Sequence, residues 1–234
     1  MNVVFRIDAS KDNGIGHLFR CKNLASSLIN RGAKVHFIMR YFDTEFRKFL
    51  KLREHKVSFL PKKKIFLKMD HENLWPKRLQ KIDAIDTKKI ISNKKIDLLI
   101  VDHYGLNSIW EKTFSKKVRK IMVISDYLNR SHSCDFFLNQ NVLKEQNLNL
   151  NRTLPKKCKI LIGPKYSLLD KSYNNYRKNI KIKNNLVSKV FISFGGSETP
   201  ELLEKVIEAF DCKELRNLQL NIASKKVLKK FPKI

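Results

Sequence analysis

Short apolar runs alternate along the chain with segments in which apolar residues recur at helical spacing. The run at 96–101 is almost continuous, which is typical of a strand buried on both faces. Between residues 16 and 31 the apolar positions fall instead on one face of a helix. This alternation predicts an α/β fold, a parallel sheet with helices on its faces. Strands are predicted at 3–7, 34–39, 57–60, 96–101, 120–124, 135–138 and 159–162, and helices at 16–31, 44–52, 78–92 and 109–115.

A polar stretch rich in Asn and Lys separates this region from a second βα pattern. We interpret 171–187 as a linker between a domain at 1–170 and a partial domain at 188–234. A unit as short as the second cannot easily close a sheet of its own. We therefore expect it to be incomplete, or completed by another chain. The elements predicted there are strands at 190–194 and 218–222 and a helix at 199–210.

The composition excludes several classes of protein. Of the 234 residues, 42% are hydrophobic, yet no run of about 18 apolar residues occurs, so no membrane span is expected. Arg6 and Asp8 interrupt the N-terminal apolar stretch, which is unlike a secretory signal. The four cysteines are scattered without a CxxC pair. Their spacing argues against zinc and favours a cytoplasmic location.

The formal net charge of +27 raises the question of nucleic-acid binding. The basic residues are mostly lysines spread along the chain, with no arginine-rich, aromatic-interleaved stripe. A nucleic-acid partner is therefore not expected, although strong RNA affinity with a steep salt dependence would favour that alternative. A basic surface would also attract an anionic substrate.

Two glycine loops each follow an apolar run and open a predicted helix. The first is Gly14-Ile15-Gly16-His17 and the second is Gly195-Gly196-Ser197. Glycine lets the backbone approach a phosphate, and free N–H groups at a helix start favour an anion. The first loop lacks the third glycine of a dinucleotide fingerprint, and Asp43 is a poor substitute for its acidic residue. NAD is not expected, and each loop alone could also be a tight βα turn.

His17 is the first candidate for chemistry. A helix N-terminus disfavours the imidazolium, so its ring would be a neutral base able to take a proton from water. Alternatively, it caps the helix. Asp102-His103-Tyr104-Gly105 follows a buried strand, where an α/β sheet opens onto its ligand cleft. Asp102 could equally cap the turn that follows it. Residues 125–127 stand at the equivalent place, directly after the next predicted strand, and the same two alternatives apply to them.

Ordered matches over about residues 3–210 resemble the UDP-2,4-diacetamido-2,4,6-trideoxy-β-L-altropyranose hydrolases of pseudaminic acid biosynthesis. The matching residues are 6–10, 14–21, 24–25, 31–33, 83–84, Thr87, 101–106, 110–111, 134–135, 138–141, 163–169 and 193–197. The resemblance implies two GT-B-like, Rossmann-type domains with a deep cleft, the second incomplete here, because family members continue with further βα units.

The resemblance also implies a metal-independent reaction without cofactor, in which water attacks the anomeric carbon of a UDP-sugar and UDP leaves. His17 would be the general base or water-orienting residue, and Tyr104, the second candidate catalytic residue, would contact the sugar or assist at the same centre. Both glycine loops would face the diphosphate. The alternatives are a nucleotide-sugar glycosyltransferase and a non-catalytic nucleotide-sugar-binding protein. The candidate substrate contacts are Asp12, Gly14, Ile15, Gly16, Arg20, Asp102, His103, Gly195, Gly196 and Ser197.

Overall fold

The computed structural model describes residues 1–9, 15–42, 55–66, 73–142, 150–180, 187–194, 200–212, 214–215 and 217–223. The chain divides into two compact units, Met1–Tyr173 and Asn174–Ile234. The predicted helix at 44–52 and the loop residues Asp12, Gly14, Gly195, Gly196 and Ser197 lie outside the described residues. Each unit is described by itself.

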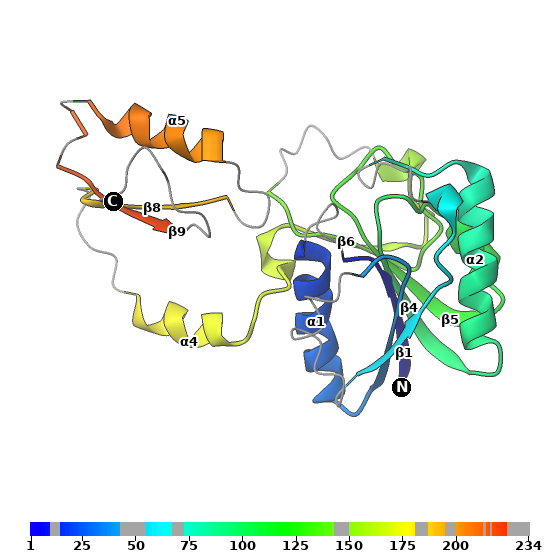
Figure 1. Cartoon of the computed structure of the whole chain (residues 1–234). Helices are drawn as coiled ribbons and strands as arrows, with labels where there is room; N and C mark the ends of the chain where they lie inside the picture. Colours follow the sequence, from blue (N-terminus) through cyan, green and yellow to red (C-terminus); the bar gives the residue numbers. More distant parts are fainter. Residues whose placement is uncertain are drawn as a thin grey trace. The chain divides into compact units, whose positions relative to one another are not determined.

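Unit 1 is built on a seven-stranded sheet whose pairs are all parallel. The strand order is β3-β2-β1-β4-β5-β6-β7, so the chain leaves β1 in one direction and returns on its other side at β4 (Figure 1). Ligands of open α/β sheets bind at the carboxyl ends of the strands at such a reversal. The strands are β1 Asn2–Ile7, β2 Lys34–Met39, β3 Lys56–Phe59, β4 Ile96–Asp102, β5 Val118–Ile124, β6 Phe136–Asn139 and β7 Lys159–Ile162.

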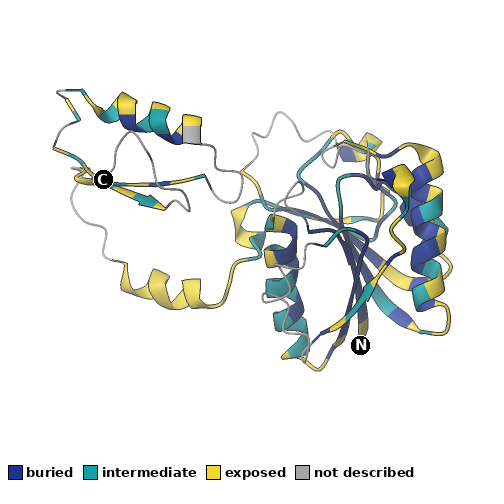
Figure 2. Cartoon of the chain, in the orientation of Figure 1, coloured by how far each residue is buried: buried dark blue, intermediate teal, exposed yellow. Residues whose placement is uncertain are grey.

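Helices α1 (Gly16–Ile29) and α2 (Lys77–Ile91) cover opposite faces of this sheet (Figure 1). Alternate residues of β1 serve the two faces, as the period of a strand requires. Val3 and Phe5 belong to the core under α1, whereas Val4 belongs to the core under α2. The central strands are buried accordingly (Figure 2). Two short helical segments, α3 (Ser108–Glu111) and the 3-10 helix Lys112–Phe114, replace the single helix predicted at 109–115.

A network of buried charges crosses the α2 face of the sheet. Arg6 of β1 contacts Asp83 of α2 at 2.8 Å and Asp8 at 2.6 Å. Arg40, which follows β2, reaches the same Asp83 carboxylate at 3.0 Å, and Trp110 Nε1 donates to it at 2.9 Å. Arg6, Asp83 and Arg40 have fully buried side chains. The network therefore links two strands, α2 and α3 through one carboxylate.

Unit 2 contains the parallel pair β8 (Lys189–Ser193) and β9 (Gln219–Ala223) with helix α5 (Pro200–Phe210). Ile192, Leu203 and Ile207 form its small core. These elements lie within two residues of those predicted.

The first half of the predicted linker 171–187 is helical, and its role as a linker stays a prediction. Residues Ser172–Asn179 form helix α4, every residue of which is exposed (Figure 2). Because α4 buries no side chain, it lacks the apolar periodicity by which a helix is recognised in a sequence. The predicted bounds 1–170 and 188–234 stay predictions. Among the described residues, no helix is long and apolar enough to cross a membrane.

Candidate functional site

The residues predicted for chemistry meet at the carboxyl ends of β1 and β4, where the strand order reverses. His17, Arg20 and Cys21 occupy positions i, i+3 and i+4 of α1 and so share one helix face. Asp102, the last residue of β4, pairs in register with Ile7 of β1 and points toward that helix face. A buried carboxylate is thereby placed against the first turns of α1.

His17 and Asp102 form a hydrogen-bonded pair, with 2.5 Å between Nδ1 and Oδ1. The Asp102 side chain is fully buried, and that of His17 is 10% exposed. A carboxylate can only accept, so Nδ1 donates to it, and whenever the ring is neutral the lone pair resides on Nε2. No residue in the described part of the chain is a hydrogen-bond partner of Nε2. The pair can therefore orient a histidine as a general base.

Arg20 holds Asp102 through two further hydrogen bonds, Nε to Oδ2 at 2.6 Å and Nη2 to Oδ1 at 2.5 Å. Burial alone would raise the pKa of Asp102, but the charges of His17 and Arg20 outweigh it and bring the pKa below its ordinary range. Cys21 Sγ adds a contact at 3.3 Å. Asp102 is consequently an anion at neutral pH, and its contacts hold the ring of His17 in place.

Arg20 also joins a second carboxylate to the site. Its Nη1 donates to Asp126 Oδ2 at 3.0 Å, and Tyr104 donates its hydroxyl to the same oxygen at 2.6 Å. The Tyr104 ring meets the His17 ring edge-on, with 4.6 Å between centroids. Burial and then the hydrogen bond to Asp126 raise the pKa of Tyr104. Tyr104 therefore remains a phenol beside His17, with its oxygen available to accept a hydrogen bond.

His103 does not join this group, although it follows Asp102 directly. It follows the last residue of β4 and lies on the α2 side of the sheet, against Asp8 and Trp75. Its Nε2 contacts Asp8 Oδ2 at 2.9 Å and its Nδ1 accepts from the Gly105 N–H at 2.9 Å. Burial lowers the pKa of His103 despite Asp8. With both ring nitrogens occupied and its side chain 4% exposed, His103 belongs to the structural network, and we assign it no substrate contact.

The turn after β4 requires a glycine at position 105, because Trp75 packs closely against it. A Cβ at this position would lie 2.6 Å from the indole ring of Trp75. Trp75 is almost fully buried and packs edge-on against His103, with 4.5 Å between ring centroids. Glycine is needed here for this close approach.

Of the remaining predicted residues, Ile15 is the N-cap residue of α1 and Gly16 its first residue. Arg20 is in the site, but two carboxylates already engage its guanidinium. The sequence analysis marked 125–127, which include Asp126, but it did not mark Asn141, and both residues lie just beyond the carboxyl ends of neighbouring strands, β5 and β6. Asn141 Nδ2 donates to Asp126 Oδ1 at 3.0 Å. The end-of-strand rule that marked Asp102 and 125–127 would also have found Asn141.

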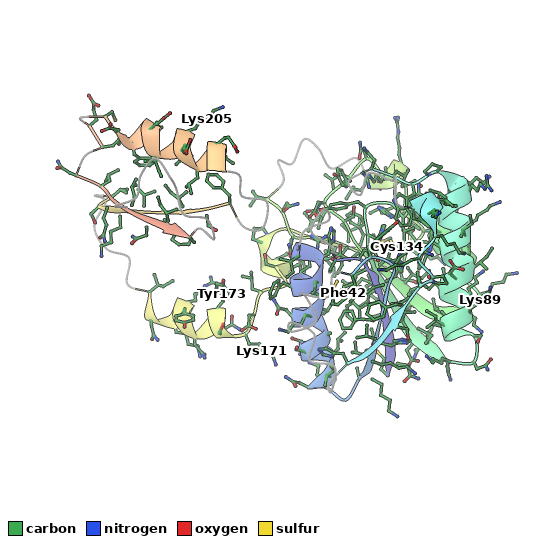
Figure 3. All side chains as sticks on the ribbon, in the orientation of Figure 1. Phe42, Lys89, Cys134, Lys171, Tyr173 and Lys205 are labelled. Atoms are coloured by element: carbon green, nitrogen blue, oxygen red, sulfur yellow. The ribbon has the colours of Figure 1, made fainter. Side chains whose placement is uncertain are left out.

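A pocket of about 630 Å³ lies beside Arg20. Residues of α1, of the turn after β6 and of the segment before α4 line it. Tyr173, labelled in Figure 3 near the start of α4, is among them. The same figure shows Lys89 projecting outward from α2, away from the sheet. No cluster of three or more His, Cys, Asp or Glu suited to a metal ion occurs among the described residues.

Comparisons with known proteins give distant likenesses. The chain is 26% identical over 226 residues to the UDP-2,4-diacetamido-2,4,6-trideoxy-β-L-altropyranose hydrolase of Campylobacter jejuni, covering 96% of this chain and 65% of that protein. It is also 26% identical over 230 residues to an uncharacterised protein of Methanocaldococcus jannaschii, covering 95% of this chain and 42% of that protein. The chain thus spans less than two thirds of the length of either relative. No protein-family model matches.

Among solved structures, the chain is similar to a UGT transferase of Siraitia grosvenorii in complex with UDP. The TM-score is 0.54 at 12% identity, over 100% of this chain and 66% of the other. This likeness concerns the fold alone and confirms the α/β, GT-B-like class predicted from the sequence.

Proposed function

We propose that this chain hydrolyses the glycosyl bond of a UDP-linked 2,4-diacetamido-2,4,6-trideoxyhexose, releasing UDP and the free sugar. The observation that carries the proposal is the His17–Asp102 pair at 2.5 Å, placed where an α/β sheet binds its ligand. The 26% identity to a named UDP-sugar hydrolase over 96% of this chain supports the substrate class.

In this reaction His17 Nε2 takes a proton from a water molecule as the water oxygen attacks the anomeric carbon. The bond between that carbon and the β-phosphate oxygen breaks, and UDP leaves with the electron pair. Asp102 keeps the proton on Nδ1 before attack and stabilises the imidazolium afterwards, as the acid of a catalytic triad does. Arg20 keeps the Asp102 carboxylate in place through two hydrogen bonds.

In this proposal Tyr104 lies next to the sugar and accepts a hydrogen bond from it. Its ring touches that of His17, and its hydroxyl proton is committed to Asp126. Tyr104 is therefore an acceptor for a sugar hydroxyl or N–H group, and its raised pKa makes it unsuited to act as the base. The backbone N–H groups of Gly14–Gly16 and Gly195–Ser197 are proposed to face the diphosphate, as such loops do elsewhere. The proposed reaction needs neither a metal nor a cofactor.

An anomeric proton NMR time course with the UDP-linked diacetamido-trideoxy-altrose tests the proposal. Hydrolysis gives free sugar and UDP in equal amounts in a buffer without acceptor. Transfer of the sugar only when an acceptor alcohol is added would replace hydrolase by glycosyltransferase, and binding without either product would identify a binding protein.

The matched control is His36→Gln. His36 is also a buried histidine, but it lies on β2 and its Nε2 contacts Ser58 at 2.9 Å. We expect His36→Gln to retain turnover and His17→Gln to lose it.

A separate chain completing unit 2 remains a prediction, and turnover that appears only when a cell extract lacking endogenous hydrolase is added would support it.

A further inference from the structure

A second pocket lies at the amino ends of strands β1 to β4, at the opposite end of the sheet from His17. Its volume is about 520 Å³, within the range of about 300–1,000 Å³ that is usual for small-ligand sites. None of the described residues that line it is acidic. Four lysines line it, one at the start of β2, one at the start of β3 and two in the turn before β4: Lys34, Lys56, Lys94 and Lys95.

These four lysines have no carboxylate partner within the part of the chain that the structure describes. Elsewhere a surface lysine does have one, as Lys120 does in its ion pair with Asp135 at 2.6 Å. Asp97 lies close in sequence to the turn before β4, but it accepts from the Asn2 N–H at 2.8 Å and lines a different pocket. No direct contact with a described acidic residue therefore compensates the positive charge of the cluster.

The ammonium groups of Lys56 and Lys94 converge beside the buried ring of His36. His36 on β2 is in register with Lys56 on β3, so the two side chains share one face of the sheet. Lys94 Nζ lies 3.4 Å from His36 Nδ1, and His36 Nε2 lies 2.9 Å from Ser58 Oγ. An ammonium can only donate, so Nδ1 accepts and the proton of the neutral ring is on Nε2. Burial and then the charges of Lys94 and Lys56 lower the pKa of His36 to about 4.

An anion bound between the two ammonium groups would offset their mutual repulsion. Burial and then the charge of Lys56 lower the pKa of Lys94, as this repulsion requires. The ammonium of lysine is a compact charge with three donors, which suits the oxygens of a phosphate. Lys94 is half-buried and the other three lysines are exposed, so a ligand can reach them from solvent. Both ring nitrogens of His36 are engaged, so His36 holds Lys94 in place and is not itself a ligand.

We propose that this pocket binds a small multivalent oxyanion of the phosphate class, held by Lys56 and Lys94. Lys34 and Lys95 add further positive charge around it. The site is separate from that of His17, and the inference does not rest on the proposed function. One basic pocket of this size fits a small anion, whereas a nucleic-acid backbone needs a longer basic groove along which to lie.

Titration of the whole chain with inorganic pyrophosphate, followed by the imidazole C–H signals in proton NMR, tests the proposal. His36 reports on this pocket and His17 on the candidate active site, so binding at either place is distinguished in one experiment. The variants His36→Gln and His17→Gln assign the signals. We expect a saturable shift of the His36 signals. Lys94→Gln and Lys56→Gln should each weaken the binding seen at His36 by about 10-fold, the effect of one hydrogen bond to a charged group.

The matched control is Lys89→Gln, which removes the same charge from an exposed position of α2 outside the pocket. It should change the affinity less than about twofold, and circular dichroism confirms that each variant is folded. The proposal is overturned if the His36 signals do not move or if only those of His17 move. Equal weakening by Lys89→Gln and Lys94→Gln would also overturn it, because the attraction would then be unspecific. A His36 shift caused by a short single-stranded RNA but not by pyrophosphate would replace the small anion by a nucleic acid.

Discussion

Replacement of Asp83 by asparagine removes the carboxylate on which the buried charge network converges. Asp83 accepts from Arg6 Nη2 at 2.8 Å, Arg40 Nε at 3.0 Å and Trp110 Nε1 at 2.9 Å. Both arginine side chains are fully buried, so neither can turn to water for a new partner. Removing one member of a buried ion pair costs about 3–5 kcal/mol, and we expect Asp83→Asn to lower the free energy of unfolding by that amount.

Urea denaturation followed by tryptophan fluorescence measures this effect in unit 1 alone. Trp75 and Trp110 are the two tryptophans of the chain, both buried in that unit. An ordinary domain has an unfolding free energy of about 5–15 kcal/mol. A loss of this size therefore strongly lowers the urea concentration at the midpoint of unfolding. Circular dichroism at zero urea confirms that the variant is folded before the comparison is made.

The control is Asp97→Asn, because Asp97 makes an exposed hydrogen bond to the Asn2 N–H at 2.8 Å. We expect this exposed change to cost less than about 1 kcal/mol. If Asp83→Asn costs no more than Asp97→Asn, the argument that one carboxylate links the two strands and α2 is refuted.

Other predictions follow from the same geometry. Gly105→Ala should destabilise unit 1 by about 1–3 kcal/mol, because its Cβ would overlap the Trp75 indole; an unchanged urea midpoint would contradict the packing. The pKa values of Asp8 and Asp102 are lowered in the folded chain despite burial. Their contribution to stability is therefore present above their ordinary pKa of 3.8 and is lost as the pH falls below it. Urea midpoints that stay constant from pH 6 to pH 3 would contradict this dependence.

Hydrophobic patterning was sufficient to predict strands β1, β2, β4, β5 and β6 because most of their residues are buried. The edge strands β3 and β7 contain no buried residue and were predicted from their short apolar runs. The run at 96–101 has apolar residues on both sides of the sheet and was the clearest case. Helix α4 was not recognised as a helix within the predicted linker because none of its side chains is buried. Patterning reports burial, so an exposed helix gives it no signal.

The sequence predicted single residues of the candidate site but not all of their contacts. A residue at the end of a buried strand and a histidine at the start of α1 could be marked from the sequence, and Asp102 and His17 do meet. Their pairing depends on β1 and β4 being neighbours, which the sequence does not reveal. The sharing of Arg20 between Asp102 and Asp126 requires the order of three strands in space.

The central claim is that His17, oriented by Asp102, activates the water that cleaves the UDP-sugar. The most direct test is the rate of UDP release from the UDP-linked diacetamido-trideoxy-altrose by the wild type, His17→Gln and His36→Gln under identical conditions. Loss of a general base predicts a 10²- to 10⁴-fold lower rate for His17→Gln, roughly the range for such catalysis, and an unchanged rate for His36→Gln. A folded His17→Gln variant that releases UDP at the wild-type rate would contradict the account.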